Sequence, residues 1–176
     1  FSTPARIDGK PTKHGGLIEE RNLDTLDSQE LMDVNARIEA LDAESIDVQV
    51  IYPTLFLAYP LTSEPPLVTA LCSSYNRWMG DTLSGNDRLK WAGVVNLEDV
   101  PAAVQGVYEA KSLGASSIMV LGTAGDHTLD KPMFLPFYEA MAETDLTLGV
   151  HVGWACPSLK NLYSELYPSW ITAFLM

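Results

Sequence analysis

The chain has 176 residues, of which 47% are hydrophobic and 19% charged, and its formal net charge is −12. Eleven Lys and Arg residues against 23 Asp and Glu residues argue against binding to nucleic acid or to an anionic membrane, because both need a basic surface. No apolar run approaches the ~18–20 residues of a membrane-spanning helix. The two cysteines, Cys72 and Cys156, form neither a disulfide framework nor a metal cluster. We therefore expect a cytoplasmic protein with one sizeable core.

Neither end of the chain carries a boundary signal. The chain opens at Phe1 without a signal-peptide pattern, and it closes on the apolar stretch 170–176 without a stop residue. We therefore expect these residues to be a piece of a longer protein.

The first part of the chain predicts an arm, a helix and a strand. Residues 1–27 are polar and interrupted by proline and glycine, which predicts a loop or arm. Asp27, with Glu30 three residues later, predicts the start of a helix. The β-branched stretch 48–52, which Pro53 stops, predicts a short strand. The apolar face of the helix consists of Leu31, Val34, Ile38 and Leu41.

Helices and strands then alternate along the rest of the chain. Prolines in a first turn predict helices that begin near residues 63–66, 99–101 and 132. Gly114 predicts the end of the second of these helices. Apolar runs predict strands at 91–95, 116–121 and 146–152, and helical spacing resumes from Leu159.

This alternation predicts an α/β fold with a parallel sheet. The strands are almost continuously apolar and no hairpin signal joins any two of them, so helices should cover the sheet. The pattern fits an open doubly wound sheet or a sector of a (β/α)₈ barrel. Both architectures bind ligands at the carboxyl ends of the strands. The candidate site segments are therefore 52–54, 96–97, 122–127 and 151–158.

His151 carries the clearest chemical signal in these segments. It ends an apolar strand, where a neutral imidazole nitrogen can bind a metal ion. A buried histidine bonded to a backbone carbonyl explains the same position. From this residue alone, we favour the structural explanation about two to one.

Four other residues at the strand ends are candidates for substrate contact. Tyr52 ends the first predicted strand and Thr54 follows it, and His127 lies in the polar loop after the third strand. Trp154 can stack on a planar substrate or pack the rim of the site, with equal weight. A solvated loop position is the simpler explanation for His127.

Two further types of site find little support. Residues 122–125 follow a strand but match no phosphate-binding pattern, so a flexible loop explains them better. Cys156 is followed directly by Pro157 and is better explained as an ordinary thiol than as a nucleophile. The sequence assigns no catalytic residue.

A series of segments occurs in a distinctive order between residues 31 and 157. This order resembles the amidohydrolase-related metal-dependent family, which includes aminocarboxymuconate-semialdehyde decarboxylase and γ-resorcylate decarboxylase. No single segment is specific, and the resemblance depends on their order and spacing. The segments are 37–38, 46–54, 75–78, 87–89, 113–114, 129–136 and 148–153.

The resemblance implies a (β/α)₈ barrel that binds one divalent metal at the strand carboxyl ends. Zinc is the first expectation, with manganese or iron as alternatives. The predicted strands then correspond to the second to fifth of the barrel, residues 28–176 to its central part, and residues 1–27 to an arm that covers the mouth. His151 matches the metal ligand at the end of the fifth strand, which reverses the preference given above. The H-x-H or E-x-H pair of the family is absent from this chain.

The implied activity is a metal-dependent hydrolase or non-oxidative decarboxylase that acts on a small, carboxylate-bearing substrate. A homo-oligomer is expected. The competing hypothesis is a non-catalytic α/β module that associates through open sheet edges. A third hypothesis, a doubly wound domain for a phosphorylated ligand, predicts a reordered sheet.

Overall fold

The computed structural model describes residues 6–7, 10–11, 26–53, 56 and 64–151. Predictions that concern other residues lie outside this part of the chain. Among them are those for Thr54, Trp154, Cys156 and the helix from Leu159.

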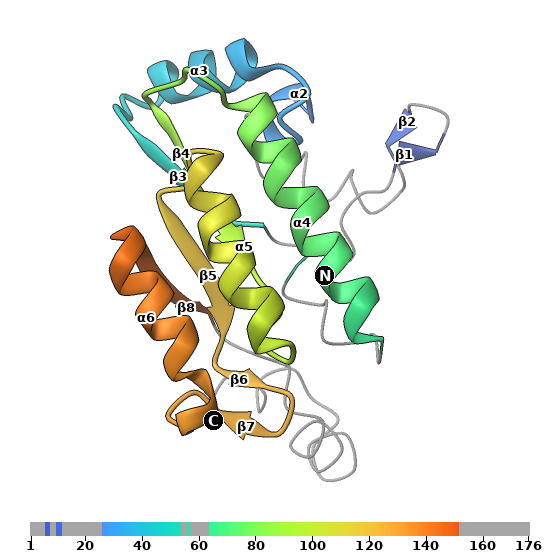
Figure 1. Ribbon diagram of the computed structural model, residues 1–176. Coiled ribbons are helices and arrows are strands. Elements are labelled where there is room, and N and C mark those ends of the chain that lie inside the picture. Colours follow the sequence, from blue (N-terminus) through green and yellow to red (C-terminus); the bar gives the residue numbers. More distant parts are fainter. Residues whose placement is uncertain (1–5, 8–9, 12–25, 54–55, 57–63, 152–176) are drawn as a thin grey trace, which may run out of the picture.

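A four-stranded parallel sheet forms the centre of the described structure (Figure 1). Its strands are β3 (Gln49–Ile51), β4 (Leu89–Val94), β5 (Ser117–Leu121) and β8 (Thr147–His151), and they pair in chain order. A doubly wound sheet requires a reversal of this order, whereas a barrel keeps it. The prediction of a partial (β/α)₈ barrel is confirmed, and the doubly wound alternative is wrong for the described strands.

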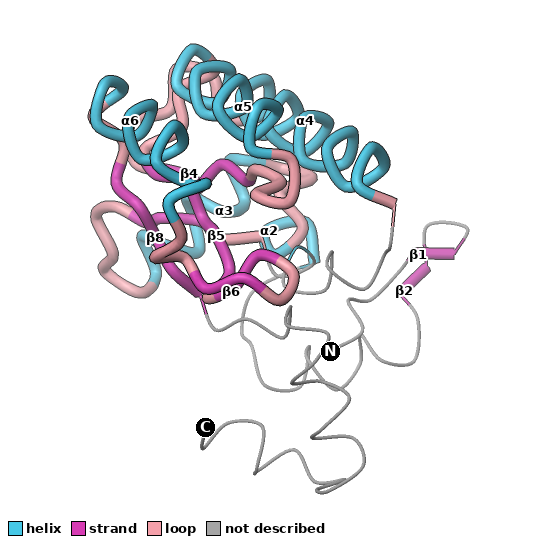
Figure 2. The backbone as a smooth tube through the Cα atoms, turned by 60° about the horizontal axis from the view of Figure 1, so that its bottom comes forward, coloured by secondary structure: helices cyan, strands magenta, loops and turns pink. Residues whose placement is uncertain are grey.

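Three long helices cover one face of the sheet, as Figure 2 shows. They are α4 (Pro65–Thr82), α5 (Val100–Ser112) and α6 (Leu135–Thr144), which the short helix η3 (Pro132–Phe134) precedes. The predicted signals act as expected in α5: the Asp99 carboxylate accepts a hydrogen bond from the Ala102 N–H at 3.1 Å. Gly114, with φ of 92°, follows this helix. No helix within the described ranges is both long enough and apolar enough to cross a bilayer.

The helix expected from Asp27 is divided in two. The chain forms α2 (Leu26–Gln29) and α3 (Val34–Ala43), so the predicted continuous helix is wrong at its start. Leu31 has φ of 54°, a left-handed conformation that an α-helix cannot contain. The Asp33 side chain then begins α3 by accepting a hydrogen bond from the Asn35 N–H at 2.8 Å.

Two short hairpins occur where loops were expected. Thr123–Ala124 (β6) pairs with His127–Thr128 (β7), so the flexible loop predicted there is wrong. Gly125 lies between the two strands with φ of 54°, which glycine adopts at low cost. Within the predicted arm, Arg6–Ile7 (β1) pairs with Lys10–Pro11 (β2).

The central sheet has a helix-covered convex face and an opposite concave face. Ile118 and Val120 of β5 belong to the same buried cluster as Phe137 of α6. Side chains alternate along a strand, so Met119 and Leu121 point to the concave face. Their register partners on β8 are Gly149 and His151, which therefore share that face.

The contact between Tyr52 and Gly149 shows how strongly the sheet curls. A Cβ atom built on Gly149 would lie 3.3 Å from both Cε1 and Oη of Tyr52. Tyr52 follows β3, while Gly149 lies on β8, and two strands separate them in the sheet. On a flat sheet β3 and β8 would be about 14 Å apart, at about 4.8 Å per strand, beyond the reach of a tyrosine side chain. The sheet is therefore a curled half-barrel.

Candidate active site

His151 stands at the carboxyl end of β8 on the concave face. It pairs in register with Leu121, the last residue of β5, and its side chain is half-buried. An imidazole nitrogen is a suitable ligand for zinc, manganese or iron. Within the described ranges, no three His, Cys, Asp or Glu side chains converge on a common point. His151 thus fits a metal as one ligand, but the described residues do not by themselves form a metal centre.

Tyr52 shares this face with His151. Its ring lies against Gly149, two residues before His151 on the same side of β8, and its side chain is 44% exposed. Among the described residues, none forms a hydrogen bond with its hydroxyl group. The structure thus brings together two of the predicted site residues, one from each edge strand of the sheet.

The position of Tyr52 depends on where β3 stops pairing. The ladder between β3 and β4 ends at Ile51 and Trp91. Ser116 N–H bonds to the Trp91 carbonyl, so Trp91 directs its backbone groups toward β5. By alternation, the N–H and C=O of Val94 point to the side that β3 has left.

Asn76 of α4 occupies this vacated side. Its Oδ1 accepts a hydrogen bond from the Val94 N–H, and its Nδ2 donates one to the Val94 carbonyl, both at 2.9 Å. The side-chain amide of Asn76 thus replaces a peptide group of the next strand, and only 1% of the residue is exposed. The sequence analysis assigned no role to Asn76. Its position between Cys72 and Met79 on the apolar side of a helix indicates a buried amide, which needs hydrogen-bond partners.

Asn96 lies in a predicted site segment but is used for structure. Its Nδ2 donates to the Pro65 carbonyl and to Thr69 Oγ1, each at 3.1 Å. Its Oδ1 accepts from the Glu98 N–H at 3.1 Å. These bonds attach the first turn of α4 to the end of β4, and Asn96 is 3% exposed. The sequence correctly placed Asn96 at the carboxyl end of a strand, but it did not reveal that the residue has a structural role.

His127 lies on the β6–β7 hairpin rather than on the concave face. Its side chain is exposed. The turn of the hairpin approaches the loop after β4, since a Cβ on Gly125 would lie 3.7 Å from the Glu98 carboxylate. Contact of His127 with substrate stays a prediction, as do the roles of Thr54 and Trp154.

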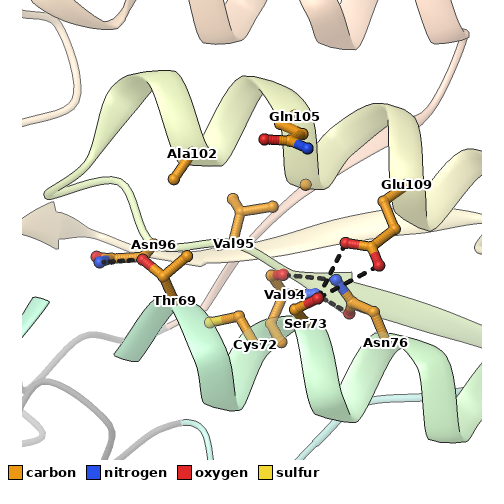
Figure 3. A pocket seen from close by; sticks show the side chains of 11 residues that line it. Thr69, Cys72, Ser73, Asn76, Val94, Val95, Asn96, Ala102, Gln105 and Glu109 are labelled. Atoms are coloured by element: carbon orange, nitrogen blue, oxygen red, sulfur yellow. Dashed lines mark hydrogen bonds between the residues drawn. The ribbon is translucent and has the colours of Figure 1, made fainter. Parts of the chain in front are cut away.

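A separate cavity of about 150 Å³ lies between α4, α5 and the end of β4 (Figure 3). Much of its polar lining is already bonded: Ser73 donates to the Glu109 carboxylate at 3.1 Å, and Asn76 and Asn96 make the bonds described above. Burial raises the pKa of the Cys72 thiol to about 12, so this thiol is protonated and unreactive at neutral pH. The cavity therefore offers no reactive thiol.

Several solved structures of enzymes are similar to the described fold. No protein-family model matches the chain, and no curated protein matches it either. Among solved structures, 5-carboxyvanillate decarboxylase from Novosphingobium aromaticivorans, with bound manganese and 3-methoxy-4-hydroxy-5-nitrobenzoic acid, is 23% identical, with a TM-score of 0.68. That match covers 88% of this chain and 42% of the enzyme.

Two further structures agree with this match. 2,6-Dihydroxybenzoate decarboxylase from Rhizobium is 18% identical with a TM-score of 0.67, over 91% of this chain and 49% of that chain. An amidohydrolase from Mycobacterium avium subsp. paratuberculosis is 19% identical with a TM-score of 0.69, over 82% and 39%. The chain thus spans less than half the length of each structure. At these identities the comparison establishes the fold, and its structural neighbours are enzymes of the amidohydrolase-related family, as the order of the sequence segments predicted.

Proposed function

We propose that the protein is a metal-dependent, non-oxidative decarboxylase that acts on a small hydroxylated aromatic carboxylate. The observation that carries this proposal is His151, which ends β8 on the concave face of a half-barrel. The carboxyl ends of barrel strands are where enzymes with this fold place their active sites. Support also comes from a neighbour of the same fold, a decarboxylase that holds manganese and a nitrobenzoic acid.

In this proposal His151 holds a divalent metal through a neutral imidazole nitrogen, together with ligands beyond the described residues. The metal, when bound, supplies positive charge that stabilises the electrons left on the substrate as carbon dioxide leaves. Leu121, the register partner of His151 on the concave face, is apolar and 1% exposed.

Hydrolysis by a metal-activated water is the second reaction considered, because one neighbour with this fold is an amidohydrolase. The neighbour with a bound nitrobenzoic acid holds manganese rather than zinc. We therefore propose manganese first, with zinc and iron as the alternatives. The cytoplasmic location remains a prediction.

The test uses the intact protein, stripped of metal and reloaded separately with manganese, zinc or iron. Release of carbon dioxide is measured with 2,6-dihydroxybenzoate and 5-carboxyvanillate. We expect His151→Ala to lower metal content and to reduce the rate by roughly 100-fold or more, because losing a ligand costs more than losing its outer-shell partner. Lys111→Ala, on an exposed position of α5, is the control. Full activity without metal, or an unaffected His151→Ala variant, would refute the proposal.

Association through the sheet edges is a second candidate property. Val48 and Val50 at the β3 edge are 53% and 47% exposed, and Val150 on β8 is 58% exposed. β3 and β8 are the outer strands of the described sheet, and outer strands with apolar side chains favour pairing with another chain. We propose a homo-oligomer on this basis. Size-exclusion chromatography of Val50→Lys and Val150→Lys should show dissociation, whereas a monomeric unsubstituted protein would contradict it.

A further inference from the structure

Gly149 makes room for the ring of Tyr52. Any side chain at position 149 would begin 3.3 Å from Cε1 and Oη of Tyr52 and 3.6 Å from the Ile118 carbonyl oxygen. The first two distances are tighter than ordinary van der Waals contact, so the ring would have to move. Glycine at this position therefore leaves room for the Tyr52 ring against β8.

The backbone around Tyr52 fixes where this ring can go. Ile51 still pairs with Trp91, and its side chain packs on the main core. Pro53 follows and is buried, which restricts the conformation of Tyr52. Asn76 meanwhile occupies the next pairing position on β4. The chain can no longer continue beside β4, and the Tyr52 ring is directed across the concave face.

The Tyr52 hydroxyl is available to a ligand. The side chain is 44% exposed, and its hydroxyl makes no hydrogen bond to another described residue. A phenol hydroxyl is both donor and acceptor, and its ring offers a flat apolar surface. The ring and hydroxyl lie against Gly149, which is two residues before His151 on the same face of β8.

We infer that Tyr52 determines substrate specificity at the site beside His151, on the concave face of the sheet. Its hydroxyl donates a hydrogen bond to a ring oxygen substituent of an aromatic carboxylate beside His151, and Gly149 is the positioning residue that seats the Tyr52 ring. This inference rests on the proposed function. It adds a preference for oxygen-substituted rings over unsubstituted rings, and it assigns that preference to one side chain.

A first experiment tests whether Gly149 makes room for the Tyr52 ring. Gly149→Ala is made in the unsubstituted protein and in a Tyr52→Ala background, and thermal midpoints are compared. We expect a clear drop in the first background and a much smaller one in the second, because the new methyl group then meets no ring. Gly122→Ala is the control, since a Cβ there meets nothing within 4 Å. Equal drops in both backgrounds would overturn the role of Gly149.

A second experiment tests the hydroxyl by calorimetry on the manganese-loaded intact protein, with 2-hydroxybenzoate and benzoate as probes. Tyr52→Phe keeps the ring and removes only the hydroxyl. We expect it to weaken 2-hydroxybenzoate binding roughly 10-fold and to leave benzoate binding unchanged, because the lost hydrogen bond goes to the ring oxygen, which benzoate lacks. In turnover, KM for a hydroxylated substrate should rise about as much, with kcat within about two-fold.

The outcomes separate this inference from the proposed function. Turnover and binding by the unsubstituted protein, with Tyr52→Phe behaving identically, would overturn the inference alone. Equal weakening of both probes would also overturn it, because the loss would not depend on the ring oxygen. Absence of both binding and turnover in the unsubstituted protein would overturn the proposed function, and the inference with it.

Discussion

The convex and concave faces of the sheet are built in opposite ways. On the convex face, Ile118 and Val120 are completely buried beneath α5 and α6. On the concave face, Val50 and Tyr52 remain 47% and 44% exposed, and His151 is half-buried. Alternate residues of the same strands thus pack against the helices on one side and leave polar side chains accessible to a ligand on the other.

The concave face is itself closed in its middle and open at its edges. Ala92, Val94 and Met119 in the middle of this face are buried, in one cluster with Val68 and Cys72 of α4. Among the described residues, the more exposed side chains of this face lie along and just after β3 and at the end of β8, where Tyr52 and His151 lie. The comparison predicts that substitutions in packed regions change stability, whereas those in the open region change binding.

The largest expected effect on stability is at Asn76. Asn76→Leu leaves the buried N–H and C=O of Val94 without partners and should cost roughly 3 kcal/mol, because each unpaired group costs about 1–3 kcal/mol. Urea unfolding measures this change. Gln105→Leu, the same replacement for an exposed amide on α5, is the control and should have little effect. A small loss for Asn76→Leu would show that the end of β4 does not depend on this side-chain amide.

A smaller effect is expected where α4 meets the end of α5. A Cβ atom on Gly80 would lie 2.9 Å from Leu113 Cβ and 3.1 Å from its carbonyl oxygen. Gly80→Ala should therefore destabilise the protein by about 1–2 kcal/mol, since overpacking outweighs the gain in helix propensity. Gly122→Ala, with open space around it, should be neutral within about 0.5 kcal/mol in the same urea titration. Similar values for both variants would contradict the packing described here.

The smallest effect concerns pH and tests whether the middle of the concave face is closed. Burial raises the pKa of Cys72 from its ordinary value of 9.0 to about 12. The unfolded chain therefore loses this proton at lower pH than the folded chain. The stability contributed by the neutral thiol is fully present below pH 9.0 and is lost as the pH rises toward about 12.

Unfolding midpoints of the unsubstituted protein and of Cys72→Ala, measured in urea at about pH 8 and about pH 10.5, isolate this contribution. The unsubstituted protein should lose more stability between the two pH values than the variant does. Parallel losses would mean that the Cys72 thiol is solvated and that the middle of the concave face is open.

Much of the architecture follows from short-range patterns in the sequence. Prolines and the Asp99 cap begin the long helices, and apolar β-branched runs form the strands in chain order. His151 was located at a strand end by the same reasoning. The apolar spacing around Leu31 predicted one continuous helix, and this prediction was wrong because Leu31 adopts a left-handed conformation that divides the helix in two.

The sequence by itself determined the order of helices and strands, and with it the barrel sector and the strand-end position of His151. Only the tertiary structure decided that Tyr52 reaches Gly149 across two strands, that Asn76 replaces a strand at Val94, and that Asn96 is structural. The physical reason is range. Helix starts and strand patterns depend on neighbours a few residues away, whereas these three roles depend on groups 18 to about 100 residues apart, which the curl of the sheet brings together.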